Sequence, residues 1–335
     1  MQKNTFMQSI GIIGEGSWGT ALLKIFQHKG FFVHWLVQDD EIRTYVEKNL
    51  HNPTYLTDVE INSTLLQLHS SIHSILKSAD TLLFVLPSAY TEELLLKIKP
   101  EKIQNKICFS AIKGILPHCH LTVCQYLHEQ LNVPEHQLGF ISGPSHAEEI
   151  AMERLTYLTV LSYNMELATE MAEALSCRYV KTRINSDVTG AEYATALKNV
   201  MAITIGIAHG LGYGDNFIAV MVSNAIKEIE HFLTCVVPHI RKITDYVYLG
   251  DLLVTCYSQF SRNRTLGIML GKGYSIKAAQ LEMNMVAEGY YAVKSIMKIA
   301  KEKNIDMPIS QALFQILYER FSPSVEIRLL TEKIY

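Results

Sequence analysis

The chain has 335 residues, a length that accommodates about two domains of ordinary size. Apolar residues make up 48% and charged residues 19%, which excludes the charge-rich composition of disordered chains. The 30 Lys and Arg residues nearly balance the 33 Asp and Glu residues, and the net charge is −3. This balance does not indicate the strongly basic surface that binds nucleic acid or an anionic membrane.

The first half of the chain alternates short apolar segments with helical periodicity. Predicted strands are 9–13, 32–37, 81–86, 106–111, 138–142, 157–161 and 178–181, and apolar spacing at i, i+3 and i+4 predicts helices such as 20–28 and 91–98. Strands too apolar to alternate are buried on both faces. We therefore expect an α/β domain with a mostly parallel sheet over residues 1–186.

The second half has a different pattern. Long helical periodicity covers 190–210, 216–234, 276–301 and 309–319, and strand signals fade after about residue 187. This change predicts an all-α domain over 187–335, although no Pro-rich or Ser-rich linker marks the border.

A glycine motif follows the first predicted strand directly. Residues 14–19 read GEGSWG, which matches GxGxxG, and the helical segment 20–28 comes next. In this setting Gly14 permits a tight turn, Gly16 lets the main chain approach a pyrophosphate, and Gly19 allows close packing of helix and strand. The alternative is a merely glycine-rich turn. The strand–turn–helix context favours a Rossmann-type dinucleotide site.

The end of the second predicted strand bears on the choice of cofactor. A carboxylate about twenty residues past the last glycine accepts hydrogen bonds from the adenosine ribose and repels the extra phosphate of NADP. Asp39 occupies that place and favours NAD, whereas Gln38 is neutral. The choice between NAD and NADP stays open.

Two lysines are candidates for chemistry on a carbonyl substrate. Hydride transfer to a ketone needs a proton donor and positive charge near the oxygen. Lys113 follows a predicted strand, at the sheet edge where such folds bind ligands, and Lys198 interrupts an otherwise apolar helix. The alternative for Lys198 is a side chain that reaches the surface.

Two polar segments leave similar alternatives open. Residues 142–148 (SGPSHAE) are either ligand contacts or an ordinary helix start. Residues 261–264 (SRNR) suit phosphate recognition, but a surface arginine pair would look the same.

Other signals favour structural roles. His118, Cys119, His120 and Cys124 lie close together, but no second ligand pair accompanies them, so we expect no metal. His69 and His73 are interpreted as belonging to an ordinary solvated or half-buried turn. The six cysteines lack CxxC spacing, and we expect no disulfides. The N-terminus lacks a signal-peptide pattern and no segment has the ~18 apolar residues of a membrane span, so we expect a cytoplasmic protein without membrane insertion.

Taken together, these motifs resemble the bacterial-type NAD(P)-dependent glycerol-3-phosphate dehydrogenases over essentially the whole chain. The matching segments, in order, are GxGxWGTAL (14–22), IKG (112–114), SGPSxAEE (142–149), ALKNV (196–200), GDN (214–216), GDLxxTC (250–256), SRNRxxGxxLGxG (261–273) and EG (288–289). The resemblance implies reversible NAD(P)H-dependent reduction of dihydroxyacetone phosphate to sn-glycerol 3-phosphate for phospholipid synthesis, without a metal. It also implies a homodimer.

The resemblance further implies roles for individual residues. Lys198 would exchange the proton with the substrate oxygen, Lys113 would polarise that oxygen and touch the nicotinamide ribose, and Asp251 would tune Lys198. The implied substrate-binding residues are Lys113, Gly143, Ser145, Lys198, Asn199, Asp251, Thr255, Ser261, Arg262 and Asn263. The implied cofactor-binding residues are Gly14, Gly16, Ser17, Trp18, Gly19, Gln38, Lys113, Gly143, Ala147, Arg262, Val286 and Glu288.

Three positions depart from the family pattern. Gln38 stands where Arg is usual, His146 stands where Phe is usual, and residues 223–225 (SNA) replace Thr-Arg-Gly. The alternative functions are a ketopantoate reductase or β-hydroxyacid dehydrogenase of the same plan, and a catalytically silent dinucleotide sensor. The segment at Arg262 and Asn263 favours a phosphorylated substrate, and the presence of Lys113, Lys198 and Asp251 argues against the sensor.

Overall fold

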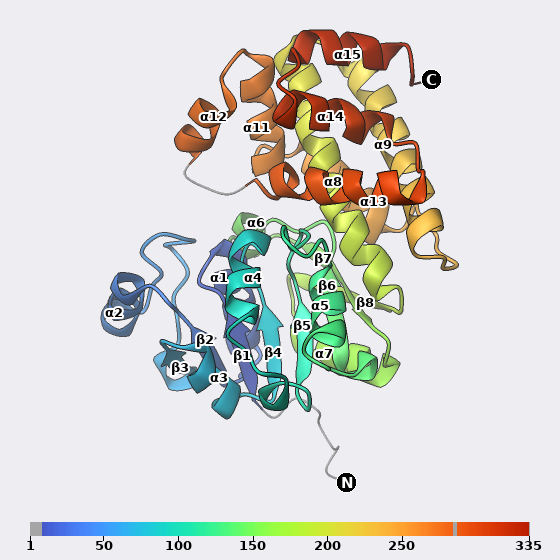
Figure 1. Ribbon diagram of the computed structural model, residues 1–335. Helices are drawn as coiled ribbons and strands as arrows, with labels where there is room; N and C mark the ends of the chain where they lie inside the picture. The colour runs from blue at the N-terminus through green and yellow to red at the C-terminus, as the bar shows by residue number, and fades with distance from the viewer. Residues whose placement is uncertain (1–8, 284–286, 335) are drawn as a thin grey trace. The chain divides into compact units, whose positions relative to one another are not determined.

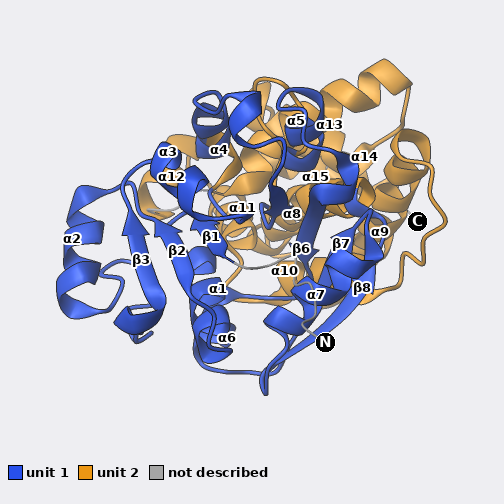
Figure 2. Ribbon diagram, turned by 90° about the horizontal axis from the view of Figure 1, so that it is seen from below, with its two compact units in different colours: residues 1–86, 90–112, 123–188 blue, residues 87–89, 113–122, 189–335 orange. Residues whose placement is uncertain are grey.

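The computed structural model describes residues 9–283 and 287–334. The chain divides into two compact units, coloured separately in Figure 2. Unit 1 comprises residues 1–86, 90–112 and 123–188, and unit 2 comprises 87–89, 113–122 and 189–335. Two short segments of the first half, 87–89 and 113–122, therefore belong to the second unit.

Unit 1 contains an eight-stranded sheet with the order β3-β2-β1-β4-β5-β6-β7-β8 (Figure 1). The strands are β1 Ile10–Ile13, β2 Val33–Leu36, β3 Leu66–His69, β4 Thr81–Phe84, β5 Ile107–Ser110, β6 Leu138–Ser142, β7 Thr156–Ser162 and β8 Val180–Asn185. All neighbours pair in parallel except β6 and β7. The prediction of a mostly parallel α/β sheet is confirmed.

Helices complete unit 1. They are α1 Ser17–His28, α2 Asp40–Asn49, α3 Ile72–Ser78, α4 Ser88–Leu95, α5 Val123–Glu129, α6 Ala147–Ala151 and α7 Met165–Leu175, with 3-10 turns at Ser63–Leu65, Pro100–Lys102 and Glu135–Gln137. Helix α4 begins inside the 87–89 segment of unit 2. One face of the sheet packs against α1, α6 and α7 in a core that includes Phe26, Trp35 and Met171. This burial explains the apolar strands of the sequence.

The sequence prediction missed β3. Leu66 and Leu68 are half-buried and Gln67 is exposed, so neither leucine marks a buried face clearly, and this edge strand is too short for its period to stand out. His69, predicted to belong to a turn, is instead its last residue and is buried. His73 lies in α3.

Unit 2 is helical. Its helices are α8 Val188–Gly210, α9 Asp215–Val236, α10 Asp251–Tyr257, α11 Arg262–Gly271, α12 Ile276–Met283, α13 Glu288–Lys303, α14 Pro308–Tyr318 and α15 Pro323–Thr331, and a π-helical turn at Tyr246–Gly250 precedes α10. The single helix predicted over 276–301 is wrong. Two helices, α12 and α13, cover that range, and residues 284–286 between them lie outside the described structure.

Close packing of α8 on α11 fixes the relative position of these two helices. Gly206 and Gly210 of α8 face Gly267 and Gly271 of α11, and a Cβ on any of the four would lie 2.9–3.1 Å from the facing glycine's Cα. Only glycine allows backbones to approach this closely. The C-terminal half of α8 is thereby locked to α11, whose first residues carry two of the predicted phosphate ligands.

Within the described residues, none of the helices combines the length and apolar character needed to cross a membrane.

Candidate active site

The glycine turn of unit 1 has the geometry that its sequence predicts. Gly14 has φ +133°, a conformation that favours glycine. A Cβ on Gly19 would collide with the carbonyl oxygen of Gly14, so helix α1 can begin this close to β1 only with glycine there. A Cβ on Gly16 would meet nothing within 4 Å. The space beside Gly16 and the N–H groups that begin α1 suit a pyrophosphate.

Hydrogen bonds hold this turn in place. The indole Nε1 of Trp35 donates to the carbonyl of Gly14 at 2.9 Å. The buried amide of Asn52 donates to the carbonyl of Glu15 at 2.9 Å and to Thr20 Oγ1 at 3.0 Å. The main chain of the turn is therefore fixed before any ligand arrives, which lowers the entropic cost of binding.

The other predicted ligand residues of unit 1 lie after strands or at helix starts. Ser17 and Trp18 begin α1, and Gln38 is exposed two residues beyond β2. Gly143 follows β6 with φ +134°. Ser145 Oγ donates to the carbonyl of Gly143 at 3.0 Å, and Ala147 begins α6.

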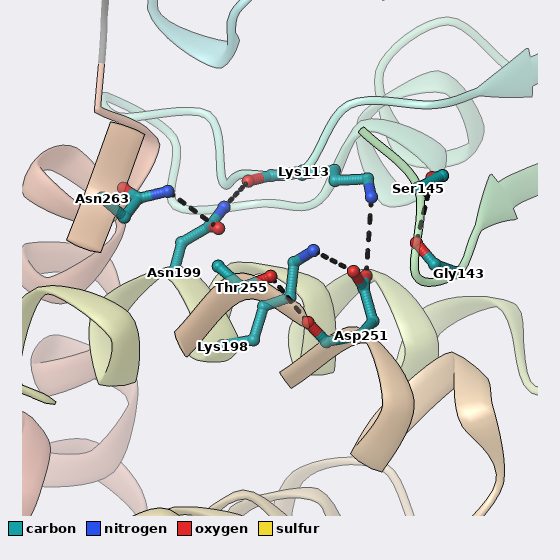
Figure 3. Close-up of polar contacts among 8 residues, drawn as sticks. All are labelled: Lys113, Gly143, Ser145, Lys198, Asn199, Asp251, Thr255 and Asn263. Atoms are coloured by element: carbon teal, nitrogen blue, oxygen red, sulfur yellow. Dashed lines mark hydrogen bonds and ion pairs between the residues drawn. The ribbon is translucent and has the colours of Figure 1, made fainter. Parts of the chain in front are cut away.

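Unit 2 brings both predicted lysines to one carboxylate (Figure 3). The ammonium group of Lys198, in α8, contacts Asp251 Oδ1, and Lys113 Nζ lies 3.5 Å from Asp251 Oδ2. Lys198 and Asp251 are buried, whereas the side chain of Lys113 is 20% exposed. The carboxylate therefore holds the two ammonium groups near each other.

The electrostatics of this group favour proton exchange by Lys198. Its pKa is lowered to about 7: burial is the largest cause, the ion pair with Asp251 opposes the shift, and the positive charge of Lys113 acts in the same direction as burial. A lysine that titrates near neutral pH can both donate and accept a proton under ordinary conditions.

An amide chain next to this group holds the backbone of Lys113. Asn199 Nδ2 donates to the carbonyl of Lys113 at 2.7 Å, and Asn263 Nδ2 donates to Asn199 Oδ1 at 2.9 Å (Figure 3). Asn263 Oδ1 in turn accepts from the N–H of Gly289 at 3.0 Å. Three elements of unit 2, α8, α11 and the start of α13, are therefore tied to the segment that carries Lys113.

Glu288 is held by a residue that the sequence analysis did not single out. Ser88 donates to both carboxylate oxygens of Glu288, from its N–H at 2.9 Å and from its hydroxyl at 2.5 Å. Burial raises the pKa of Glu288, and these two hydrogen bonds and Arg262 oppose the rise. A Cβ on Gly114 would collide with Glu288, which explains the glycine after Lys113. Nothing local in the sequence marks Ser88, because its partner lies 200 positions away.

The remaining predicted residues lie in α10 and at the start of α11. Thr255 Oγ1 donates to the carbonyl of Asp251 at 2.6 Å. Ser261 is the N-cap of α11 and accepts from the N–H of Arg264, and Arg262 is exposed in the first turn. Val286 lies outside the described residues.

His146 and residues 223–225, which depart from the family pattern, lie at the start of, or within, helices of the two units. His146 is the N-cap residue of α6. The hydroxyl of Ser223 and the side-chain amide of Asn224 donate hydrogen bonds to backbone carbonyls of their own helix, α9. Ala225 is buried.

Over the part of the chain that the structure describes, no cluster of three or more His, Cys, Asp or Glu side chains is arranged to bind a metal ion.

Comparison with known proteins supplies the family. Residues 9–168 match the N-terminal model of NAD-dependent glycerol-3-phosphate dehydrogenase, and residues 187–328 match the C-terminal model. A glycerol-3-phosphate dehydrogenase [NAD(P)+] of Clostridium botulinum is 31% identical over 329 residues, covering 98% of both chains. One from Oceanobacillus iheyensis is 32% identical over 95% of this chain and 92% of its own.

A solved structure agrees over nearly the full length. The crystal structure of glycerol-3-phosphate dehydrogenase from Coxiella burnetii has a TM-score of 0.91 at 28% identity, covering 98% of this chain and 99% of its own.

Proposed function

Because this chain belongs to the family of NAD-dependent glycerol-3-phosphate dehydrogenases, we propose that Lys198 is the proton donor when it reduces dihydroxyacetone phosphate. The chain is an oxidoreductase that forms sn-glycerol 3-phosphate reversibly with NAD(P)H. The bound dinucleotide supplies the hydride to the substrate carbonyl carbon. The residues of this chain must then provide the proton and stabilise the developing negative charge on the oxygen.

The ion-paired group Lys198–Asp251–Lys113 carries this proposal. In reduction, Lys198 Nζ gives its proton to the substrate oxygen as negative charge develops there. Lys113 contributes a second positive charge to that oxygen, which lowers the energy of the transition state. Asp251 keeps both ammonium groups in position, and in oxidation Lys198 takes the proton back.

The phosphate of the substrate needs cationic and N–H donors. Arg262 offers a guanidinium group in the first turn of α11, where helix N–H groups also favour an anion. Asn263 follows it, and its amide already bonds Asn199 and Gly289. We assign the phosphate to Arg262 and Asn263, with Ser145 and Ser261 assisting, and the substrate hydroxyl to Asp251 and Thr255. Gly143 and Asn199 complete the substrate-binding set.

The cofactor is assigned to residues of both halves of the sequence. The pyrophosphate is assigned to Gly14, Gly16 and Gly19, which give the turn its open approach. The other proposed cofactor residues are Ser17, Trp18, Gln38, Lys113, Gly143, Ala147, Arg262, Val286 and Glu288.

Three further expectations belong with this function. Glycerol 3-phosphate is the backbone of glycerophospholipids, so the product would feed their synthesis. We also propose a cytoplasmic location and a homodimer.

A substrate comparison tests the proposed function. Purified enzyme is given NADH or NADPH with dihydroxyacetone phosphate or with ketopantoate, and dinucleotide oxidation is followed by absorbance. We expect turnover with dihydroxyacetone phosphate. Turnover with ketopantoate alone would overturn the assignment, because that substrate lacks the phosphate that Arg262 and Asn263 are assigned to bind.

A further inference from the structure

Glu15 brings a second carboxylate to the end of β2, where the sequence indicated only Asp39. Strands β1 and β2 pair in parallel with Ile13 opposite Leu36. Glu15 and Gln38 each lie two residues beyond these paired ends, and Asp39 comes next. Because parallel neighbours leave the sheet at the same edge, Glu15 emerges beside the end of β2.

Contacts agree with this placement. The backbone carbonyl of Glu15 accepts from the side-chain amide of Asn52, whose Oδ1 in turn accepts from the N–H groups of Thr54 and Tyr55. Burial raises the pKa of the Glu15 carboxyl, while backbone hydrogen bonds, including those from Gln38 and Asp39, lower it and the charge of Asp39 raises it. The side chain therefore faces the end of β2 and the first residues that follow it.

One oxygen of this carboxylate lacks a partner. Glu15 Oε2 is inaccessible to solvent and makes no hydrogen bond within the described chain. A buried acceptor without a donor costs free energy, and such atoms are rare in folded proteins. In this fold the adenosine ribose of a dinucleotide lies at the end of the second strand, so a ribose hydroxyl would supply the donor once the Glu15 side chain turns toward it.

The cationic group of nearby α2 is already engaged. Arg43 donates to the carbonyl of Val37 at 3.2 Å and to Asp40 at 2.6 Å. Asp39 accepts from the N–H groups of Glu41 and Ile42 as the N-cap of α2. Arginine is the residue that accommodates a 2′-phosphate in this fold. Here the guanidinium of Arg43 lies near the end of β2 but is paired with Asp40 and with the carbonyl of Val37, and the carboxylates of Glu15 and Asp39 lie at the same end of the strand.

We propose that Glu15 is a specificity residue that makes this enzyme prefer NADH to NADPH, by accepting a hydrogen bond from the adenosine ribose and repelling a 2′-phosphate. The inference rests on the assignment of residues 14–19 to the dinucleotide. It differs from a role for Asp39 alone, because the half-buried Glu15 carboxylate belongs to the glycine turn itself. Neutralising Glu15 should change the discrimination even when Asp39 is intact.

Binding measurements on the full-length enzyme separate this proposal from the function that underlies it. The dissociation constants of NADH and NADPH are measured by dinucleotide fluorescence for the wild type and for Glu15→Gln. Adenosine 5′-monophosphate and adenosine 2′,5′-bisphosphate are measured by calorimetry as probes of the adenosine end. We expect the wild type to favour NADH at least about tenfold, and Glu15→Gln to reduce that preference about tenfold, mainly through tighter NADPH binding.

Two variants serve as comparisons. Glu47→Gln removes the same charge from an exposed position on α2 and should leave the preference unchanged. Asp39→Asn keeps an N-cap that asparagine provides equally well and should reduce the preference separately from Glu15→Gln. Circular dichroism and the melting temperature check that each variant is folded. If Glu15→Gln does not fold, a preference for adenosine 5′-monophosphate over adenosine 2′,5′-bisphosphate that survives in Asp39→Asn supports the role of Glu15, and its complete loss in Asp39→Asn overturns it.

The possible outcomes separate the specificity role of Glu15 from the dehydrogenase function on which it rests. Equal wild-type affinity for NADH and NADPH, or a Glu15→Gln preference equal to that of the wild type, overturns the specificity role and leaves the dehydrogenase function intact. A wild-type enzyme that binds neither dinucleotide overturns both.

Discussion

At the scale of single residues, the proposed role of Lys198 makes the rates of reduction and oxidation depend on pH in opposite ways. Lys198 is buried against Asp251 and Lys113, and burial lowers its pKa to about 7. If Lys198 is the proton donor, as we propose, reduction needs Lys198 protonated, and the protonated fraction falls as pH rises through that pKa. We expect the rate of dihydroxyacetone phosphate reduction to fall above about pH 7, and the rate of glycerol 3-phosphate oxidation to fall below it. Initial rates in both directions, measured across pH at saturating substrate, check this.

The variant Lys198→Met identifies the group responsible. Methionine has a similar length but cannot transfer a proton, so kcat should fall about a hundredfold to ten-thousandfold in both directions. NADH affinity, measured by fluorescence, should change little. A variant that retains the wild-type rate and pH profile would assign the proton to another group.

At the scale of elements, the distance between α8 and α11 is set by four glycines. A Cβ at Gly267 would meet the backbone of α8 near Gly206, and backbone cannot move aside as a side chain can. Gly267→Ala should therefore lower the free energy of unfolding by about 1–3 kcal/mol. Because α11 carries Arg262 and Asn263, the KM for dihydroxyacetone phosphate should rise as well. Chemical denaturation and steady-state kinetics measure the two effects.

Gly214→Ala provides the matched comparison on the same unit. A Cβ there would meet nothing within 4 Å, and the residue has an ordinary φ of −79°. This change should cost less than about 1 kcal/mol and leave KM unchanged, since only the N-cap preference of α9 is affected. Equal effects of the two substitutions would show that helix contact is not the cause.

At the scale of the whole molecule, the proposed assembly is a dimer of the 37.9 kDa chain. The net charge of −3 is small, so electrostatic repulsion between copies is weak. Sedimentation equilibrium at micromolar concentration should give about twice the mass of the chain. A single species at the mass of one chain, over the whole range of concentrations, would contradict the proposal.

The sequence by itself determined the class of fold, the cofactor family and the reaction. Apolar strands indicated a buried parallel sheet, and GxGxxG in its strand–turn–helix setting indicated a dinucleotide site, because both are local patterns that backbone geometry requires. Eight ordered motifs indicated the family. Two features with weak local signals were not predicted from the sequence: the edge strand β3 and the break between α12 and α13.

Only the tertiary structure decided which distant side chains meet. Lys113, Lys198 and Asp251 are far apart in sequence, and their motifs suggested a common site without giving its geometry. The contact of Ser88 with both oxygens of Glu288, and the Glu15 oxygen that has no partner among the residues the structure describes, carry no local signature. Periodicity records which face of an element is buried, whereas the partner of a polar group depends on how the chain returns from many residues away.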